Sequence, residues 1–147
     1  KIDRGHNPFV FATLEPSVAA YHLAFGPDGH LFVAGPSTSS NDAIWRISPK
    51  GEVTTFCSGL GRPQGIAFDV AGNLYVVASH AGRRGVICIS PRGEIECVVS
   101  ANNLVGLAFA PGARGGPHPA ALILASHTSL YHLGWPSPGL PLPLVSP

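Results

Sequence analysis

The sequence predicts an all-β fold made of four-stranded antiparallel blades of a β-propeller. Two observations carry this prediction: an internal repeat of about 40 residues, and short apolar segments separated by turns rich in glycine and proline. Residues 22–33 align with residues 65–76, and a shorter copy follows at 106–109. A repeat of this length with several short strands in each copy is typical of propeller blades. About three blades fit into the 147 residues.

The repeat boundaries divide the chain. Residues 1–15 are predicted to be the outer strand of a preceding blade, because residues 9–14 align with 55–60, the end of a repeat. Three blades then follow, at 16–60, 61–103 and 104–147, the last with a proline-rich tail. Propellers close with four to eight blades. The sequence therefore predicts a partial ring, completed by other blades from a missing part of the chain or from another subunit.

Four strands are expected in each copy. Small and large apolar residues alternate in the inner strand, while Val, Leu, Ile and aromatic residues fill the second strand, as in a strand covered on both faces. The inner strands are predicted at 22–26, 65–69 and 106–110, the second strands at 31–34, 74–78 and 121–125, and the third strands at 44–47, 86–89 and 129–133. Outer strands are predicted at 53–57 and 95–99.

Two sets of apolar residues test this assignment. One phenylalanine in each inner strand shares a register with the others and is predicted to be buried: Phe25, Phe68 and Phe109. Alternating leucines in the tail predict that it supplies the outer strand of the last blade, where proline is tolerated at an edge: Leu140, Leu142 and Leu144.

The connections are predicted from turn residues. Gly29 and Gly72 occupy the turn after the inner strand, where glycine adopts a positive φ at no steric cost. Polar loops at 36–42 and 80–85 lead into the third strands. A Ser-Pro-Lys/Arg-Gly-Glu segment then forms a hairpin into the outer strand of the first two blades. Asp28 and Asp69 lie in or beside the turns and are expected to accept backbone hydrogen bonds.

Composition narrows the class of protein. Charged residues make up 12% of the chain, about half of the usual share, which fits blade faces that pack against neighbours. A net charge of +1 gives no basic field for nucleic acid, and no apolar run is long enough to span a membrane. We expect a soluble protein, cytoplasmic or periplasmic, that binds neither nucleic acid nor a membrane. The three cysteines are expected to be buried free thiols, although Cys88 and Cys97 lie on two arms of one hairpin.

Residues 62–69 and 72–77 carry a family resemblance. Arg-Pro-Gln-Gly-Ile-Ala-Phe-Asp followed by Gly-Asn-Leu-Tyr-Val-Val resembles the blade motif of NHL-repeat proteins and of the senescence-marker-protein/gluconolactonase/luciferin-regenerating-enzyme family. The tail, with Tyr131-His132-Leu133 and the Gly139-Leu-Pro-Leu segment, looks like the end of members of the second group. This resemblance implies a ring of six blades, of which this chain is the C-terminal part.

The resemblance also implies a divalent cation at the mouth of the central channel in complete members of the family. Its ligands there are a glutamate from an early blade, then an asparagine and an aspartate. The matching positions in this chain are Tyr21, Gln64 and Val105, and only Gln64 offers a suitable oxygen. We therefore expect no metal ligand and no cofactor in this part of the chain, while the glutamate position would precede it.

Loops from several blades are expected to meet at one face. Because antiparallel strands reverse direction each time, the loop entering the inner strand and the loop after the second strand emerge together. This face is expected to gather 37–42 and 102–103 with the candidate ligand-binding residues Tyr21, His22, Arg62, Gln64, His80 and His127. Arg62 could hold a carboxylate or phosphate in bidentate fashion, or simply be a solvated loop residue. Arg83 and Arg84 form a short basic pair in a loop.

His22 is the candidate catalytic residue, since it replaces the glycine of the other two copies. With His80 and His127, each in an Ala-Ser-His tripeptide, it could act as a general acid or base or bind a metal. Alternatively, these tripeptides only cap loop backbone groups. Two functions stay open: a propeller that binds a small polar ligand or a partner at its mouth, or a lactonase-like hydrolase or lyase with its other catalytic residues on absent blades.

Overall fold

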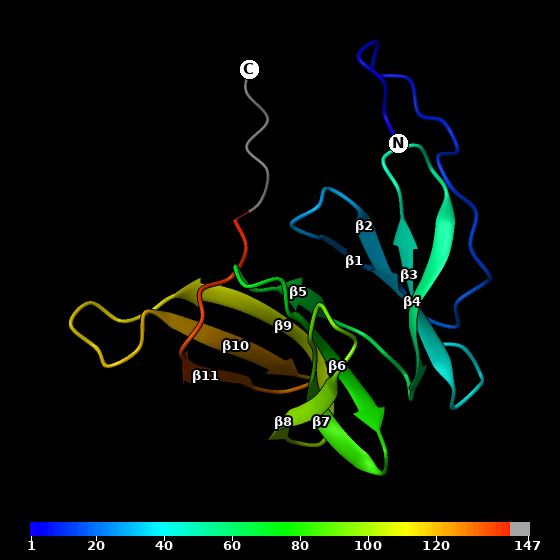
Figure 1. Cartoon of the computed structure of the whole chain (residues 1–147). Helices are drawn as coiled ribbons and strands as arrows, with labels where there is room; N and C mark the ends of the chain where they lie inside the picture. The colour runs from blue at the N-terminus through cyan, green and yellow to red at the C-terminus, as the bar shows by residue number, and fades with distance from the viewer. Residues whose placement is uncertain (142–147) are drawn as a thin grey trace.

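The computed structural model describes residues 1–141 as an all-β protein of three antiparallel sheets (Figure 1). The predicted all-β class with antiparallel sheets is confirmed, but within residues 1–141 the third sheet has three strands where four were predicted. No helix of the length and hydropathy needed to cross a membrane occurs in this part of the chain. The first sheet contains β1 (His22–Phe25), β2 (Leu31–Ala34), β3 (Asp42–Ile47) and β4 (Val53–Leu60). The second contains β5 (Ile66–Phe68), β6 (Leu74–His80), β7 (Arg83–Ile89) and β8 (Ile95–Ser100). The third contains β9 (Leu104–Pro111), β10 (Ala120–Ser126) and β11 (Leu130–Trp135).

The tail does not lie where the sequence predicted. Between Pro138 and Leu140 it pairs with β5: the Val70 N–H donates to the Pro138 carbonyl at 2.9 Å, and the Leu140 N–H donates to the Phe68 carbonyl at 2.8 Å. Leu140 packs against the core of the first two sheets. The expected outer strand beside β11 is therefore wrong for the described part of the tail, while Leu142 and Leu144 lie outside the described residues.

The inner strands lie side by side, β1 next to β5 and β5 next to β9. A Cβ atom added at Gly65 would lie 2.6 Å from the Gly106 Cα and 2.8 Å from the Leu107 nitrogen. The Gly65 N–H also donates to the Val105 carbonyl at 3.3 Å. Glycine at this position is thus explained by the close approach of two backbones, which leaves no room for a side chain.

Aromatic contacts join neighbouring sheets in the same way twice. The Phe68 ring meets the Phe32 ring edge-on with centroids 4.7 Å apart, and the Phe109 ring meets the Tyr75 ring at 5.3 Å. Phe32 and Tyr75 occupy equivalent positions on the second strands, opposite Ala24 and Ala67. Phe68 and Phe109 therefore each pack against the second strand of the sheet before their own.

Phe25 corrects the prediction that all three phenylalanines are buried. Phe68 is 4% exposed and Phe109 is half-buried, but Phe25 is 47% exposed. Its position in the ladder matches theirs, since Phe25 pairs with Leu31 as Phe68 pairs with Leu74. The difference arises because the described residues contain no sheet before the first one to cover it.

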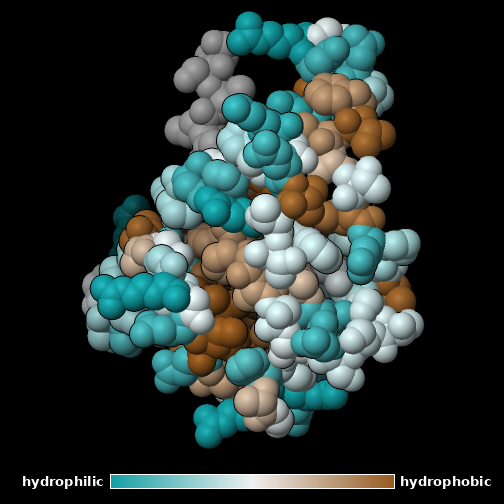
Figure 2. All heavy atoms as spheres, turned by 45° about the vertical axis from the view of Figure 1, so that its right-hand side comes forward, coloured by the Kyte–Doolittle hydropathy of each residue, from teal (hydrophilic) through white to brown (hydrophobic). Residues whose placement is uncertain are grey.

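The surface around Phe25 is apolar. Phe25 lines a cavity of about 410 Å³ together with Phe11 and Ile47, and Leu23 on the same strand is 60% exposed. Figure 2, with the side of the first sheet turned forward, shows apolar residues reaching the surface in patches among polar ones. Residues 9–16 lie outside the strands. Their assignment to a preceding blade stays a prediction, because the other strands of that blade are not in this sequence.

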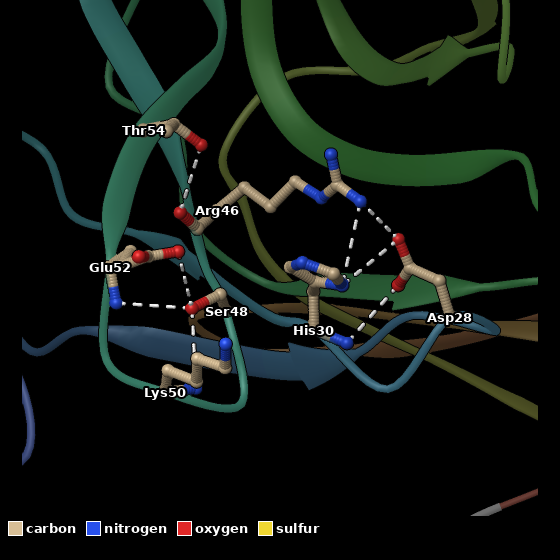
Figure 3. Close-up of polar contacts among 7 residues, drawn as sticks. All are labelled: Asp28, His30, Arg46, Ser48, Lys50, Glu52 and Thr54. Carbon is tan, nitrogen blue, oxygen red and sulfur yellow. Dashed lines mark hydrogen bonds and ion pairs between the residues drawn. The ribbon is translucent and has the colours of Figure 1, made fainter.

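The turn chemistry agrees with the sequence. In the hairpin into β4, the Ser48 hydroxyl accepts the N–H groups of Lys50 and Glu52 (Figure 3), and Gly51 has φ 91°. The equivalent hairpin into β8 repeats both bonds at Ser90, with Gly93 at φ 84°. The outer hairpins are therefore fixed by a short polar motif.

The two turn aspartates have the structural role that was expected. Asp69 is 1% exposed, and its carboxylate accepts the N–H groups of Ala71 and Asn73 and the Tyr75 hydroxyl. Asp28 accepts the His30 N–H and also forms an ion pair with Arg46 at 2.6 Å (Figure 3). Neither carboxylate lies at the face where the loops gather.

The cysteines are free thiols. Cys88 pairs across the ladder with Glu96, while Cys97 pairs with Ile87, so the two sulfur atoms point to opposite faces of the second sheet. A disulfide between the arms of this hairpin is therefore excluded. Burial raises the pKa of the Cys57 thiol to about 11 and also raises the pKa of Cys88, so both stay protonated at neutral pH.

Candidate functional site

Two neighbouring cavities open where loops of the three sheets meet. One, of about 200 Å³, lies between the second and third sheets, and the other, of about 410 Å³, lies between the first and second. Both are lined by Gly61, Arg62, Ser79 and Arg84, which form the wall between them. We call these four residues the shared wall. Part of the predicted set of loops therefore meets on one face, namely residues from 37–40, 61–64, 79–84, 103–105 and 127.

Hydrogen bonds fix the main chain at Arg62. It has φ 49°, an uncommon conformation for a residue with a side chain. Its N–H donates to Asp42 Oδ2 at 3.0 Å, and the preceding Gly61 exchanges two backbone hydrogen bonds with Ser79. Asn103 stands at the equivalent place before the third sheet, also with positive φ, 61°. The loops that enter β5 and β9 therefore have a positive φ at equivalent positions. Arg62 and Asn103 both line the smaller cavity.

Asp42 fixes both the loop after β2 and the main chain of Arg62. It is 5% exposed, and its Oδ1 accepts both the N–H and the hydroxyl of Ser37 while Oδ2 accepts the Arg62 N–H. A buried carboxylate is tolerated because its oxygens are engaged by hydrogen-bond donors. This one side chain joins the loop after β2 to the loop before β5.

Substituting Asp42 by asparagine is expected to lower the free energy of unfolding by about 1–3 kcal/mol. The amide group would turn an N–H toward one of the donors that the carboxylate now satisfies. Chemical denaturation measures the loss. Asp28→Asn is the matched control, because Asp28 lies in an exposed turn and should lose well under half as much. Equal losses would contradict an organising role for Asp42.

Arg84 is placed by a tight hairpin that the sequence analysis missed. A polar loop was predicted at 80–85, but β6 and β7 run up to His80 and from Arg83, joined by Ala81 and Gly82 alone. Both turn residues have positive φ, 47° and 78°, as a type I′ turn requires. The prediction of a polar loop at 80–85 is therefore wrong. Sequence reasoning missed it because alanine is an unusual residue at such a position.

The hairpin ladder places Ser79 opposite Arg84. Since residues opposite each other in an antiparallel pair point to the same face, both reach the shared wall. Arg84 thus belongs to a strand rather than to a mobile loop. Its repeat equivalent in the first sheet is Asp42, which also lies at this face.

The predicted site residues separate into two groups. Arg62, Gln64 and His127 line the smaller cavity, and Arg62 and His80 line the larger one. Tyr21 and His22 line neither of these two cavities. The Tyr21 hydroxyl donates to the Glu15 carbonyl, and burial lowers the pKa of His22, which favours its neutral form.

The histidines do not form a metal centre in the described part of the chain. Residues 1–141 contain no group of three or more His, Cys, Asp or Glu side chains placed to hold a metal ion. His80 Nδ1 lies 3.3 Å from the Gly59 carbonyl, a contact with the backbone of β4. At the family positions, Val105 offers only an alkyl group and Tyr21 is engaged with Glu15, so these residues do not fit a divalent cation.

Comparison with known proteins supports the fold. The chain is similar to an X-ray structure of a protein described as a "putative gluconolactonase", with a TM-score of 0.53 and 20% sequence identity. The match covers 80% of this chain and 45% of that one, so this chain spans less than half of its length. No family model and no curated protein matches the sequence. At this identity the likeness shows the fold alone, an all-β protein of the β-propeller type.

Proposed function

We propose that this chain is part of a gluconolactonase-like propeller that binds a small polar ligand at the mouth of its channel. The observation that carries the proposal is the pair of cavities that meet at the shared wall, with Arg62 and Arg84 in both. Gln64, Asn103, His80 and His127 add hydrogen-bonding groups around them. Concave sites with a few convergent polar groups are the usual form of small-molecule sites.

Other blades of the same repeat are the proposed partners. The support is the apolar face of the first sheet, where Phe25 stands in the place that Phe68 and Phe109 fill with packed rings. An aromatic or large aliphatic residue on the second strand of a preceding blade would cover it. A complete ring would be needed to supply the glutamate of the family's cation site, and the proposal includes no cofactor held by residues 1–141 alone. A net charge of +1 favours neither nucleic acid nor a membrane surface as a partner.

A lactonase-like hydrolase is the second candidate. It is favoured by the name of the similar structure, and its remaining catalytic residues would lie on blades outside this sequence. In that case the ligand at the mouth would be a sugar lactone, with His22 as the candidate general acid or base. The two functions differ in one measurable respect, since only the hydrolase turns over a lactone.

The test uses the full-length protein in two assays. Amide chemical shifts are followed by NMR during titration with a panel of small sugars, sugar acids and sugar lactones, and lactone hydrolysis is followed by proton release. Saturable shifts at the shared wall without hydrolysis support the binding function. Hydrolysis at a rate well above that of buffer supports the enzyme, and a panel that shifts no amide at the mouth contradicts both.

His22→Gly tests whether His22 belongs to the site. Because His22 lines neither cavity, we expect the variant to bind ligands with unchanged affinity and to lose roughly 1–2 kcal/mol of stability through added backbone freedom and lost burial. Titration and thermal unfolding measure the two quantities. A variant that folds normally but no longer binds or turns over would instead place His22 in the site.

A further inference from the structure

The shared wall carries positive charge that nothing in the described chain neutralises. Arg62 and Arg84 are both exposed on it, and neither guanidinium lies within salt-bridge distance of a carboxylate among residues 1–141. The lining residues of the two cavities, taken over this same range, include no aspartate and no glutamate. In a chain whose charged residues total only 12%, two unpaired arginines at one wall are a concentrated feature.

The nearest organising carboxylate does not oppose these charges from inside the cavities. Asp42 is buried behind the wall, and its oxygens accept hydrogen bonds from Ser37 and from the Arg62 backbone rather than from a guanidinium group. Asp42 fixes the Arg62 main chain and leaves its side chain free to reach a ligand. The basic side chains therefore face the cavities, and the acidic one faces the protein.

Neutral hydrogen-bond donors surround the two arginines. Besides the two arginines, the larger cavity is lined by Thr38, Ser39 and Ser40, which carry hydroxyl groups, and the smaller one by Gln64 and Asn103, which carry amides. Hydroxyl and amide groups donate well to anionic oxygens, and a guanidinium group holds a carboxylate or phosphate through two parallel hydrogen bonds. The set of side chains suits an acid better than a neutral sugar.

We propose that the ligand of this site carries an oxyanion group, a carboxylate or a phosphate, which binds at the shared wall between Arg62 and Arg84 while the rest of the ligand extends into one of the two cavities. This inference rests on the proposed binding function and specifies its ligand class. The anchoring is prearranged, because the Arg62 backbone is fixed by Asp42 and Arg84 lies on the paired end of β7. Prearranged donors lose less conformational freedom on binding.

The test is a titration of the full-length protein with inorganic phosphate, with succinate and with glucose, each at constant ionic strength. Amide shifts at Gly61 and Ser79 report binding at the shared wall. Arg62→Gln and Arg84→Gln should each weaken phosphate and succinate binding about tenfold or more, since each removes charge-assisted hydrogen bonds. Arg83→Gln is the matched control, because Arg83 adjoins Arg84 but lines neither cavity. The affinity of this variant for phosphate and succinate should change less than about twofold.

The outcomes distinguish this inference from the function on which it rests. Saturable phosphate or succinate binding that is lost in both cavity variants and kept in Arg83→Gln supports it, and a preference for one of the two probes identifies the oxyanion. Glucose binding without phosphate or succinate binding overturns the oxyanion and keeps the binding function. Equal weakening in all three variants reveals only a diffuse charge effect and also overturns it, as does the absence of binding by any probe. Circular dichroism of each variant verifies that it is folded.

Discussion

Phe68→Ala is expected to lower the free energy of unfolding by about 3–5 kcal/mol, the usual cost of removing a buried phenylalanine ring. Phe68 is 4% exposed and packs edge-on against Phe32 in the sheet before it, which in turn meets Phe56 with centroids 5.0 Å apart. The substitution would leave a cavity between the first two sheets. Urea denaturation of the 147-residue chain, followed by the fluorescence of its two tryptophans, measures the loss.

Phe25→Ala provides the matched control. Phe25 occupies the same position in the repeat, yet it is 47% exposed, so its loss should be below about 1 kcal/mol in this chain. In a longer protein that contains a preceding blade, the same substitution should approach the cost at Phe68. Similar losses at both positions in the 147-residue chain would show that the first sheet is covered by something other than a preceding blade.

The strands could be predicted from the sequence because each repeat carries its own local signals. Apolar alternation locates the inner strands, and the serine and glycine of the outer hairpins fix those turns at Gly51 and Gly93. These interactions join residues close together in the chain. They are therefore readable from a short window of sequence, and the structure reproduces them.

Features that depend on distant neighbours could not be predicted in the same way. The exposure of Phe25 depends on a sheet that the sequence does not contain, and the tail pairs with β5 because Leu140 reaches a core formed about 70 residues earlier. The place of Arg84 depends on a two-residue turn at Ala81 whose positive φ is not signalled by alanine. Sequence analysis named Arg62 and the face on which the proposed site lies, while Arg84 could be added to that site only from the hairpin geometry.

Gly65→Ala is the second substitution with a large expected effect. A single methyl group at this position would lie within 3 Å of the Gly106 Cα and the Leu107 nitrogen. Both are backbone atoms, so no side chain can rotate to make room and the inner strands β5 and β9 must move apart. Overpacking of this kind costs about 1–3 kcal/mol when side chains yield, and the rigid backbone here places the expected loss at about 3 kcal/mol or more.

Gly106→Ala is its control because Gly106 stands at the equivalent position of the next repeat. A methyl group there would meet only the Ala125 side chain, at 3.7 Å, an ordinary van der Waals contact. We expect a change within about 1 kcal/mol, and a small gain is allowed because alanine restricts the unfolded chain more than glycine does. Urea denaturation of the two variants in parallel measures the difference. If both alanines were tolerated equally, the inner strands would not approach each other as closely as the structure has them; if only Gly65→Ala is destabilising, the crowding occurs where β5 meets β9.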